Sequence, residues 1–123
     1  MTAATLGLIL LSVTISAAAQ ICLKLGMSSP AVQLAISSGG VGAIFTVASN
    51  PAVLGGLALY GLGAISWLFA LAKVDVSQAY PFVAIGIVLT LAAGYFLLAE
   101  PVTPLRVVGV LVVIIGIGLV AHS

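Results

Sequence analysis

Charged residues are almost absent from this chain. Of its 123 residues only 4% are Asp, Glu, Lys or Arg, whereas 63% are hydrophobic. An ordinary soluble domain has about a quarter of its residues charged. The three Lys and Arg residues do not cluster and the net charge is +1, which excludes the basic face that nucleic-acid-binding proteins use. The composition predicts a protein whose solvent is the lipid bilayer.

Groups that support catalysis or metal binding are equally scarce. The chain has one His, one Cys and two carboxylates, Asp75 and Glu100. Cys22 has no cysteine partner for a disulfide, and in an apolar run such a residue behaves as a small buried hydrophobe. One His and one Cys cannot form a metal site alone, and no nucleophile is paired with a base. We therefore expect no metal, no cofactor and no enzymatic activity.

Apolar segments of helical length occupy most of the sequence. A bilayer core takes about 20 apolar residues per helix, and backbone groups in lipid must be paired within the segment, which favours helices. We predict an all-α membrane protein, a four-transmembrane-helix bundle that forms one domain over residues 1–123. The spans are expected at about residues 6–25, 51–72, 78–98 and 105–120. The connector, residues 27–50, has apolar stretches too short to span, and we expect it to lie partly on the membrane surface.

The first predicted span also has features of a cleaved leader. Small residues at positions 16–19 are typical of a signal-peptidase site. However, no Lys or Arg precedes Lys24, and the apolar character continues to Leu25. A retained first helix is therefore the expected outcome.

Alternating spans sort the charges onto the two sides of the membrane. Lys24, Glu100 and Arg106 fall on one side, and Lys73 and Asp75 fall on the other. Orientation follows the excess of Lys and Arg in short loops. A difference of two basic residues against one is too small to fix the orientation, so both orientations stay open.

Polar residues recur every fourth position in the first span. Ser12, Ser16, Gln20 and Lys24 form one slowly turning stripe on a helix of 3.6 residues per turn. Two interpretations stay open: the stripe hydrogen-bonds to a neighbouring helix, or it lines a substrate groove. Tyr80, at the start of the third span, is typical of an interfacial or packing aromatic and is a second candidate for substrate contact.

Glycines in the last span suggest helix association. Gly109 and Gly116 are seven residues apart and share one face. Small residues let helices approach closely in lipid, either within one chain or between chains. Because four helices enclose little volume, we expect a homodimer, or a heterodimer with a similar four-helix chain, with these glycines at the interface.

Several short motifs resemble those of the small drug/metabolite transporters. They are residues 20–24 (QICLK), 76–82 (VSQAYPF) and 99–104 (AEPVTP), followed by the two spaced glycines. The start of the third span, residues 79–81 (AYP), and the loop at residues 100–104 (EPVTP) are more similar to subunits of the flippase that moves undecaprenyl-phosphate aminoarabinose across the bacterial inner membrane. The glycine pair is more similar to the related small multidrug resistance exporters. The resemblance covers nearly the whole chain.

One position of this sequence distinguishes the flippase subunits from the exporters. The position that resembles the exporters' membrane-embedded glutamate is Ser16, and no acidic residue lies within a predicted span. A hydroxyl cannot replace a titrating carboxylate in proton exchange. The favoured hypothesis is a subunit that flips a polyprenyl-phosphate-linked sugar or a similar glycolipid, with Lys24 and Arg106 contacting the phosphate. The alternatives are a small-molecule exporter and a non-transporting accessory subunit.

Overall fold

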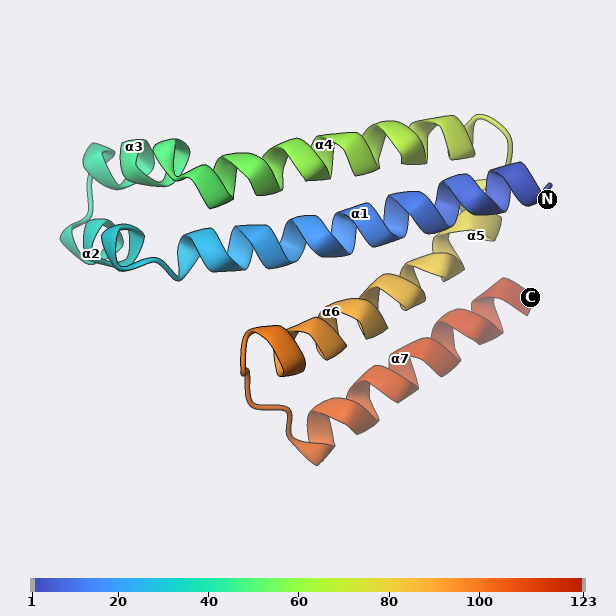
Figure 1. The fold of residues 1–123 in the computed structure, drawn as a ribbon. Coiled ribbons are helices and arrows are strands. Elements are labelled where there is room, and N and C mark those ends of the chain that lie inside the picture. Colours follow the sequence, from blue (N-terminus) through green and yellow to red (C-terminus); the bar gives the residue numbers. More distant parts are fainter. Residues whose placement is uncertain (1, 123) are drawn as a thin grey trace.

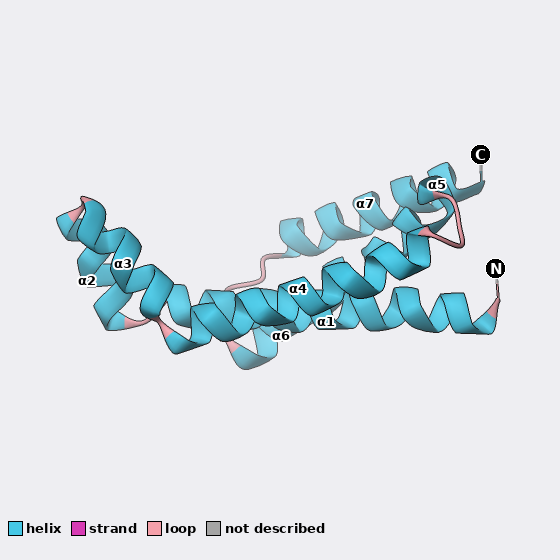
Figure 2. Cartoon of the chain, turned by 90° about the horizontal axis from the view of Figure 1, so that it is seen from above, coloured by secondary structure: helices cyan, strands magenta, loops and turns pink. Residues whose placement is uncertain are grey.

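The computed structural model describes residues 2–122, and this part of the chain contains helices and no strands. The helices, labelled in Figure 1, are α1 (Ala3–Met27), α2 (Pro30–Ser38), α3 (Val41–Ser49), α4 (Pro51–Leu71), α5 (Val76–Ala79), the 3₁₀ turn η1 (Tyr80–Phe82), α6 (Val83–Leu97) and α7 (Pro104–His122). The prediction of an all-α chain is confirmed. Figure 2 shows the same helices from above, with only short loops between them.

Three of these segments are long and apolar enough to cross a membrane: Ala3–Met27, Pro51–Leu71, and Val76–Leu97, which joins α5, η1 and α6. The last helix contributes a shorter apolar stretch, Pro104–Val120. Large hydrophobic side chains are widely exposed, among them Leu105 and Phe96. Such a surface suits lipid better than water. The architecture is that of a multi-pass membrane protein.

Proline and a polar cap mark the starts of two helices. The Asn50 side-chain oxygen accepts hydrogen bonds from the backbone N–H groups of Ala52 and Val53, at 3.0 and 3.1 Å, and Pro51 occupies the first turn of α4. Ser29 plays the same part for α2, which begins at Pro30. Proline fits the first turn because its missing N–H has no partner there in any case. These caps fix where the two helices begin.

The longest contact in the fold is the antiparallel pair formed by α1 and α4 (Figure 1). Three buried glycines let the two backbones approach. A Cβ atom at Gly56 would lie 2.8 Å from the Leu23 side chain, and one at Gly63 would lie 2.8 Å from the Ser16 hydroxyl. A Cβ atom at Gly26 would meet Val53 at 2.6 Å. The pair is thus packed along its length through positions where only glycine fits.

The hairpin of α6 and α7 is joined more loosely to this pair. Near the chain termini, Ile9, Val13, Ala70 and Ala79 form a buried cluster where α1, α4 and α5 meet. From there α6 diverges from α1 toward its C-terminal end (Figure 1). In the described part of α7 no side chain is fully buried. Helix α7 therefore exposes most of its surface.

The connector between α1 and α4 is a helical hairpin. It reverses direction at Gly39 and Gly40, whose φ angles of 73° and 79° are readily adopted only by glycine. The Asn50 amide donates a 3.2 Å hydrogen bond to the Ser29 hydroxyl, which ties together the two points where the hairpin joins the long helices. No charged residue occurs between positions 27 and 50. Its placement on the membrane surface stays a prediction.

Candidate functional site

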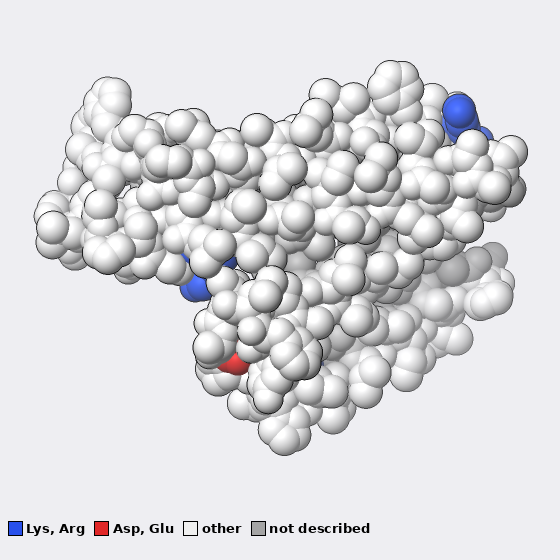
Figure 3. Space-filling view, in the orientation of Figure 1, with Lys and Arg blue, Asp and Glu red and all other residues white. Residues whose placement is uncertain are grey.

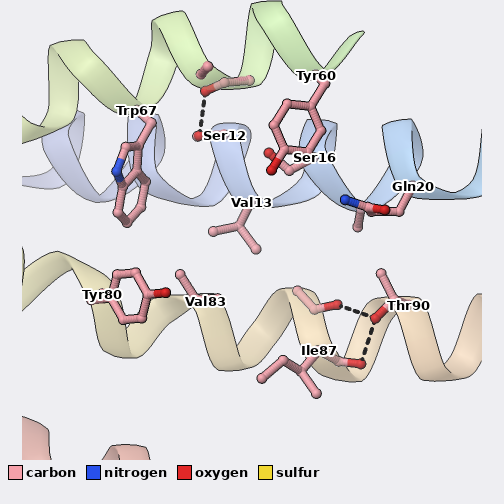
Figure 4. A pocket seen from close by; sticks show the side chains of 14 residues that line it. Ser12, Val13, Ser16, Gln20, Tyr60, Trp67, Tyr80, Val83, Ile87 and Thr90 are labelled. Carbon is pink, nitrogen blue, oxygen red and sulfur yellow. Dashed lines mark hydrogen bonds between the residues drawn. The ribbon is translucent and has the colours of Figure 1, made fainter. Parts of the chain in front are cut away.

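A cavity lies between α1, α4 and the η1–α6 segment (Figure 4). Its volume is about 450 Å³. Each of the three segments contributes polar groups to a wall that is otherwise apolar. The polar and aromatic side chains in the lining are Ser12, Ser16, Gln20, Tyr60, Trp67, Tyr80 and Thr90.

Three members of the predicted stripe, Ser12, Ser16 and Gln20, lie in this wall. The Ser12 hydroxyl, 2% exposed, donates a 2.6 Å hydrogen bond to the carbonyl oxygen of Gly63 on α4. Ser12 therefore also joins two helices, as the packing interpretation expected. Ser16 and Gln20 make no hydrogen bond within the described residues, so their polar groups are available to a ligand. One stripe thus contains both a packing contact and open cavity lining.

Lys24 lies one helical turn beyond Gln20 and does not line this cavity. Toward its C-terminal end α6 diverges from α1 (Figure 1). Its side chain is exposed. The structure therefore places Lys24 outside the cavity that holds the rest of the stripe.

Aromatic side chains form much of the opposing surface. Tyr80, 58% exposed, enters the lining from η1, and Trp67 and Tyr60 enter from α4. In Figure 4 the Tyr60 ring lies beside Ser16, and the Trp67 ring lies on the α4 side of the space, opposite Tyr80. An aromatic face with a hydroxyl or N–H at its edge can cover the apolar side of a sugar ring and bond its hydroxyl groups.

Two polar contributors were not among the predicted site residues. Thr90 on α6 donates its hydroxyl to the carbonyl oxygens of Gly86 and Ile87, both at 3.0 Å. Its oxygen keeps acceptor capacity toward the cavity. The Tyr60 ring belongs to the middle of α4. A polar group in the middle of an apolar span was the sequence signal that could have identified both residues.

Arg106 belongs to a second, smaller cavity of about 240 Å³ at the turn between α6 and α7. Glu100 and Tyr95 line the same space, and Ile87 and Thr90 border both cavities. The two cavities are therefore neighbours along α6. The predicted phosphate contacts Lys24 and Arg106 lie toward the same end of the fold but do not share a cavity.

The charges of the molecule are few and isolated. Figure 3 shows small blue and red areas on a face that is otherwise uncharged. No ion pair within 4.0 Å joins any of the charged side chains among residues 2–122. Within that range no group of three His, Cys, Asp or Glu side chains could hold a metal ion. The chemistry that the arrangement supports is recognition by hydrogen bonds and single charges.

Gly109 and Gly116 both open onto free space. A Cβ atom at either position would have no neighbour within 4 Å. The two glycines therefore serve no close packing within the described chain, in contrast with Gly56 and Gly63 of α4. Their predicted role at a dimer interface stays a prediction.

Comparison with known proteins supports the resemblance seen in the sequence. A probable 4-amino-4-deoxy-L-arabinose-phosphoundecaprenol flippase subunit ArnE of Pseudomonas aeruginosa is 38% identical over 63 residues, which are 51% of this chain and 55% of that protein. The chain resembles the ArnE flippase subunits. The protein of the same name from Enterobacter sp. (strain 638) is 39% identical over 61 residues, 50% of this chain and 57% of that protein.

The ArnE similarity is partial. A third ArnE protein, from Pseudomonas savastanoi pv. phaseolicola, is 34% identical over 61 residues, 50% of this chain and 54% of that protein. The chain thus spans about half the length of the curated relatives it matches. No family model matches the chain. No solved structure matches it either. The relatives are named as flippase subunits, which are transporters rather than enzymes.

Proposed function

We propose that this chain is a subunit of a flippase that moves a polyprenyl-phosphate-linked sugar, or a similar glycolipid, across the bacterial inner membrane. The observation that carries the proposal is the cavity between α1, α4 and α6. Its walls place Ser16, Gln20 and Tyr80 between helices whose outer faces are apolar. A sugar head group needs such hydrogen-bonding groups, while its polyprenyl chain can remain in lipid.

The lipid's phosphate requires a cation. Arg106 is the stronger candidate, because it lines the smaller cavity. That cavity lies next to the larger one, and Thr90 lines both. Its guanidinium donates a 2.7 Å hydrogen bond to the Pro101 carbonyl oxygen, which holds the side chain near the loop and leaves other N–H groups for a phosphate. Lys24 is the second candidate, exposed toward the same end of the fold.

The proposal includes a fourth span and a second chain. The 19 residues of α7 would extend about 28 Å at 1.5 Å per residue, close to the 30 Å of a typical hydrocarbon core. The exposed face with Gly109 and Gly116 is suited to close approach of a partner helix in lipid. We propose a homodimer, or a heterodimer with a similar four-helix chain, that completes the wall of the transport path.

Proton-coupled export of small molecules has less support. Neither Asp nor Glu lines the larger cavity, so the cavity lacks the titrating acid that such exchange uses. A purely accessory subunit would not need a polar cavity inside an apolar bundle. Flipping of a polar head group accounts for both the cavity and its neutral lining.

Reconstituted vesicles that contain a labelled polyprenyl-phosphate sugar test the proposal. The purified chain, alone or with its similar partner chain, should bind the lipid and move it between leaflets. Arg106→Ala or Lys24→Ala should weaken binding about 10- to 150-fold, because charge-assisted contacts contribute about 1.5 to 3 kcal/mol. Lys73→Ala, at the opposite end of the fold, is the matched control and should change binding little.

Absence of both binding and movement in the wild-type chain, with and without the partner, would reject the flippase. The accessory-subunit hypothesis would then replace it. Normal transport by the Arg106 and Lys24 variants, singly and together, would instead remove these two residues from phosphate recognition.

A further inference from the structure

The α2–α3 hairpin exposes large apolar side chains. Leu34 is 70% exposed, Ile44 68% and Phe45 69%. Among residues 30–49, which the structure describes throughout, Val32 alone is buried. The part of the surface that the hairpin forms, at the left of Figure 3, carries no charge. Helices with apolar side chains exposed in this way require an apolar environment, and the rest of the described chain covers little of this hairpin.

Polar side chains of the α2–α3 hairpin are satisfied within the hairpin and its junctions. The serine and threonine hydroxyls of the two helices donate to carbonyl oxygens of the preceding helical turn. The Gln33 amide donates a 2.6 Å hydrogen bond to the Met27 carbonyl oxygen. Within residues 29–50 every polar side chain has at least one hydrogen bond: Ser29, Gln33, Ser37, Ser38, Thr46, Ser49 and Asn50. Polar groups in lipid need such partners within the protein.

The long helices treat hydroxyls outside the cavity in the same way. Thr14 on α1 donates to the Leu10 carbonyl oxygen, and Ser66 on α4 donates to the Leu62 carbonyl oxygen. A hydroxyl bonded to its own helix backbone is compatible with contact to lipid. No charged residue occurs between positions 25 and 72. The uncharged surface of α4 therefore continues onto the α2–α3 hairpin without interruption.

The two long helices are long enough to cross the membrane without this hairpin. The 25 residues of α1 and the 21 residues of α4 extend about 38 Å and about 32 Å at 1.5 Å per residue, whereas a typical hydrocarbon core is about 30 Å thick. Figure 2 shows that the α2–α3 hairpin is bent away from the line of α1 and α4. The bend lets it lie along the membrane boundary instead of projecting straight into water.

The tip of the α2–α3 hairpin has unpaired backbone groups. Helix α3 begins after Gly40, which provides no side-chain cap. The first N–H groups of a helix have no partner within the helix, so they need water or lipid head groups. Insertion with the tip foremost would bury these groups in hydrocarbon. The tip therefore belongs at the level of the head groups, and the apolar sides of the hairpin belong deeper.

We propose that the α2–α3 hairpin lies flat in one leaflet, with its sides among the acyl chains and its tip at the head groups. The partner is the acyl region of the lipid, irrespective of head-group charge, because the segment has no Lys or Arg to attract anionic lipids. The 3.2 Å hydrogen bond between Asn50 and Ser29 ties both ends of the hairpin to the long helices. The contact thus fixes the depth of the α1–α4 pair in the bilayer, independently of the proposed transport.

Photolabelling of the wild-type chain in lipid nanodiscs tests the environment of the hairpin. One diazirine reagent is soluble in lipid and the other is soluble in water, and mass spectrometry locates the label. The lipid-soluble reagent should label Ile44 and Phe45 as strongly as Leu57, an exposed residue of α4. The water-soluble reagent should label them several-fold less than the turn at Asp75. This comparison requires no substitution.

Spin labels measure the depth of the sides and of the tip. Cys22→Ala removes the one native cysteine, and a nitroxide is then attached to a cysteine introduced at Leu34, Phe45 or Ser38. Accessibility to oxygen relative to a nickel complex should be several-fold higher at Leu34 and Phe45 than at Ser38, next to the tip. The values should be the same in phosphatidylcholine and in membranes that contain phosphatidylglycerol.

A charge on the side of the hairpin should move it toward water. Ile44→Lys places an ammonium group among the acyl chains, where charge is costly, so it should raise nickel accessibility of a label at Leu34. Ser38→Lys is the matched control. Its charge lies near the tip, at the level of the head groups, and should leave the label at Leu34 unchanged.

Three results would overturn the proposal. Labelling of Ile44 and Phe45 by the water-soluble reagent as strongly as the turn at Asp75 would place the hairpin in water. Weak labelling by both reagents would show that a protein partner covers it. A tip deeper than the sides, or insertion only with phosphatidylglycerol present, would exclude the flat, charge-independent arrangement. Loss of lipid transport would bear on the flippase proposal and leave these measurements unaffected.

Discussion

The Ser12 hydroxyl donates its hydrogen bond to the backbone carbonyl of Gly63, and the 2.6 Å contact links the middles of α1 and α4. Since Ser12 is also part of the cavity wall, the position of the wall depends on how closely the two helices pack. Gly63 permits that approach because it has no side chain. Packing and binding are therefore connected at this pair of residues.

A methyl group at Gly63 should separate the two helices. The new Cβ atom would lie 2.8 Å from the Ser16 hydroxyl and 3.3 Å from the Ser12 carbonyl oxygen. Gly63→Ala should lower the free energy of unfolding in detergent by about 1 to 3 kcal/mol, the usual cost of overpacking. Gly61→Ala, on the same helix with open space at its Cβ, is the control. Equal stability of the two variants would show that α1 and α4 are not packed as described.

Loss of polar lining should slow movement of the head group more than it weakens phosphate binding. Gln20→Leu and Ser16→Ala remove hydrogen-bonding groups from the cavity wall; alanine is chosen at Ser16 because a larger side chain would strike Gly63. Transport in vesicles should fall about 5- to 30-fold if each contact contributes about 1 to 2 kcal/mol.

Thr14→Ala is the matched control for these lining variants. Its exposed hydroxyl bonds to the Leu10 carbonyl oxygen on its own helix and lies outside the cavity. Transport by this variant should stay close to that of the wild-type chain. A similar loss in all three variants would indicate a general effect on α1 rather than a role of the cavity wall.

Bulky side chains on the open face of α7 should separate paired subunits. Replacing both Gly109 and Gly116 with Leu blocks close backbone approach, and a Cβ atom at either position has no neighbour within 4 Å in the described chain. Crosslinking in membranes should show a lower dimer yield at normal expression. The control is Gly55→Leu with Gly61→Leu, on α4, where the Cβ positions are also open. An unchanged yield in the α7 variant would remove this face from the interface.

Addition of a cationic drug to the detergent-solubilised chain should release no protons. The larger cavity has no acidic residue in its lining, so ligand entry displaces no proton from a buried carboxylate. A sensitive pH indicator in weakly buffered solution measures the release. Stoichiometric release that disappears in Glu100→Gln would support the exporter hypothesis and identify the titrating acid.

The sequence predicted that the polar residues of α1 share one face, because this depends only on helical periodicity. Ser12, Ser16 and Gln20 share a face wherever an α-helix forms. Lys24 continues the same stripe, yet it lies outside the cavity, because the divergence of α6 from α1 is a tertiary feature with no local signal. Periodicity fixes which face a residue occupies but not how far a neighbouring helix follows that face.

Other parts of the site depended on partners that the sequence does not specify. Gly56 and Gly63 have the same spacing as Gly109 and Gly116, and only the three-dimensional arrangement shows that the α4 pair is covered by α1 while the α7 pair is open. The position of Glu100 depends on left-handed backbone at Ala99, which is unusual for alanine. Neither feature follows from residue type or spacing.

The glycine contacts between α1 and α4 also determine which part of the molecule can move. The two backbones approach closely at Gly26, Gly56 and Gly63, so that α1 and α4 are packed tightly over most of their length. The hairpin of α6 and α7 has no such restraint at its outer end. We therefore expect α1 and α4 to stay in place relative to each other and the α6–α7 hairpin to move as a unit against them. Its pivot would be the buried cluster around Ala79, so that the largest displacement occurs at the turn that holds Glu100 and Arg106.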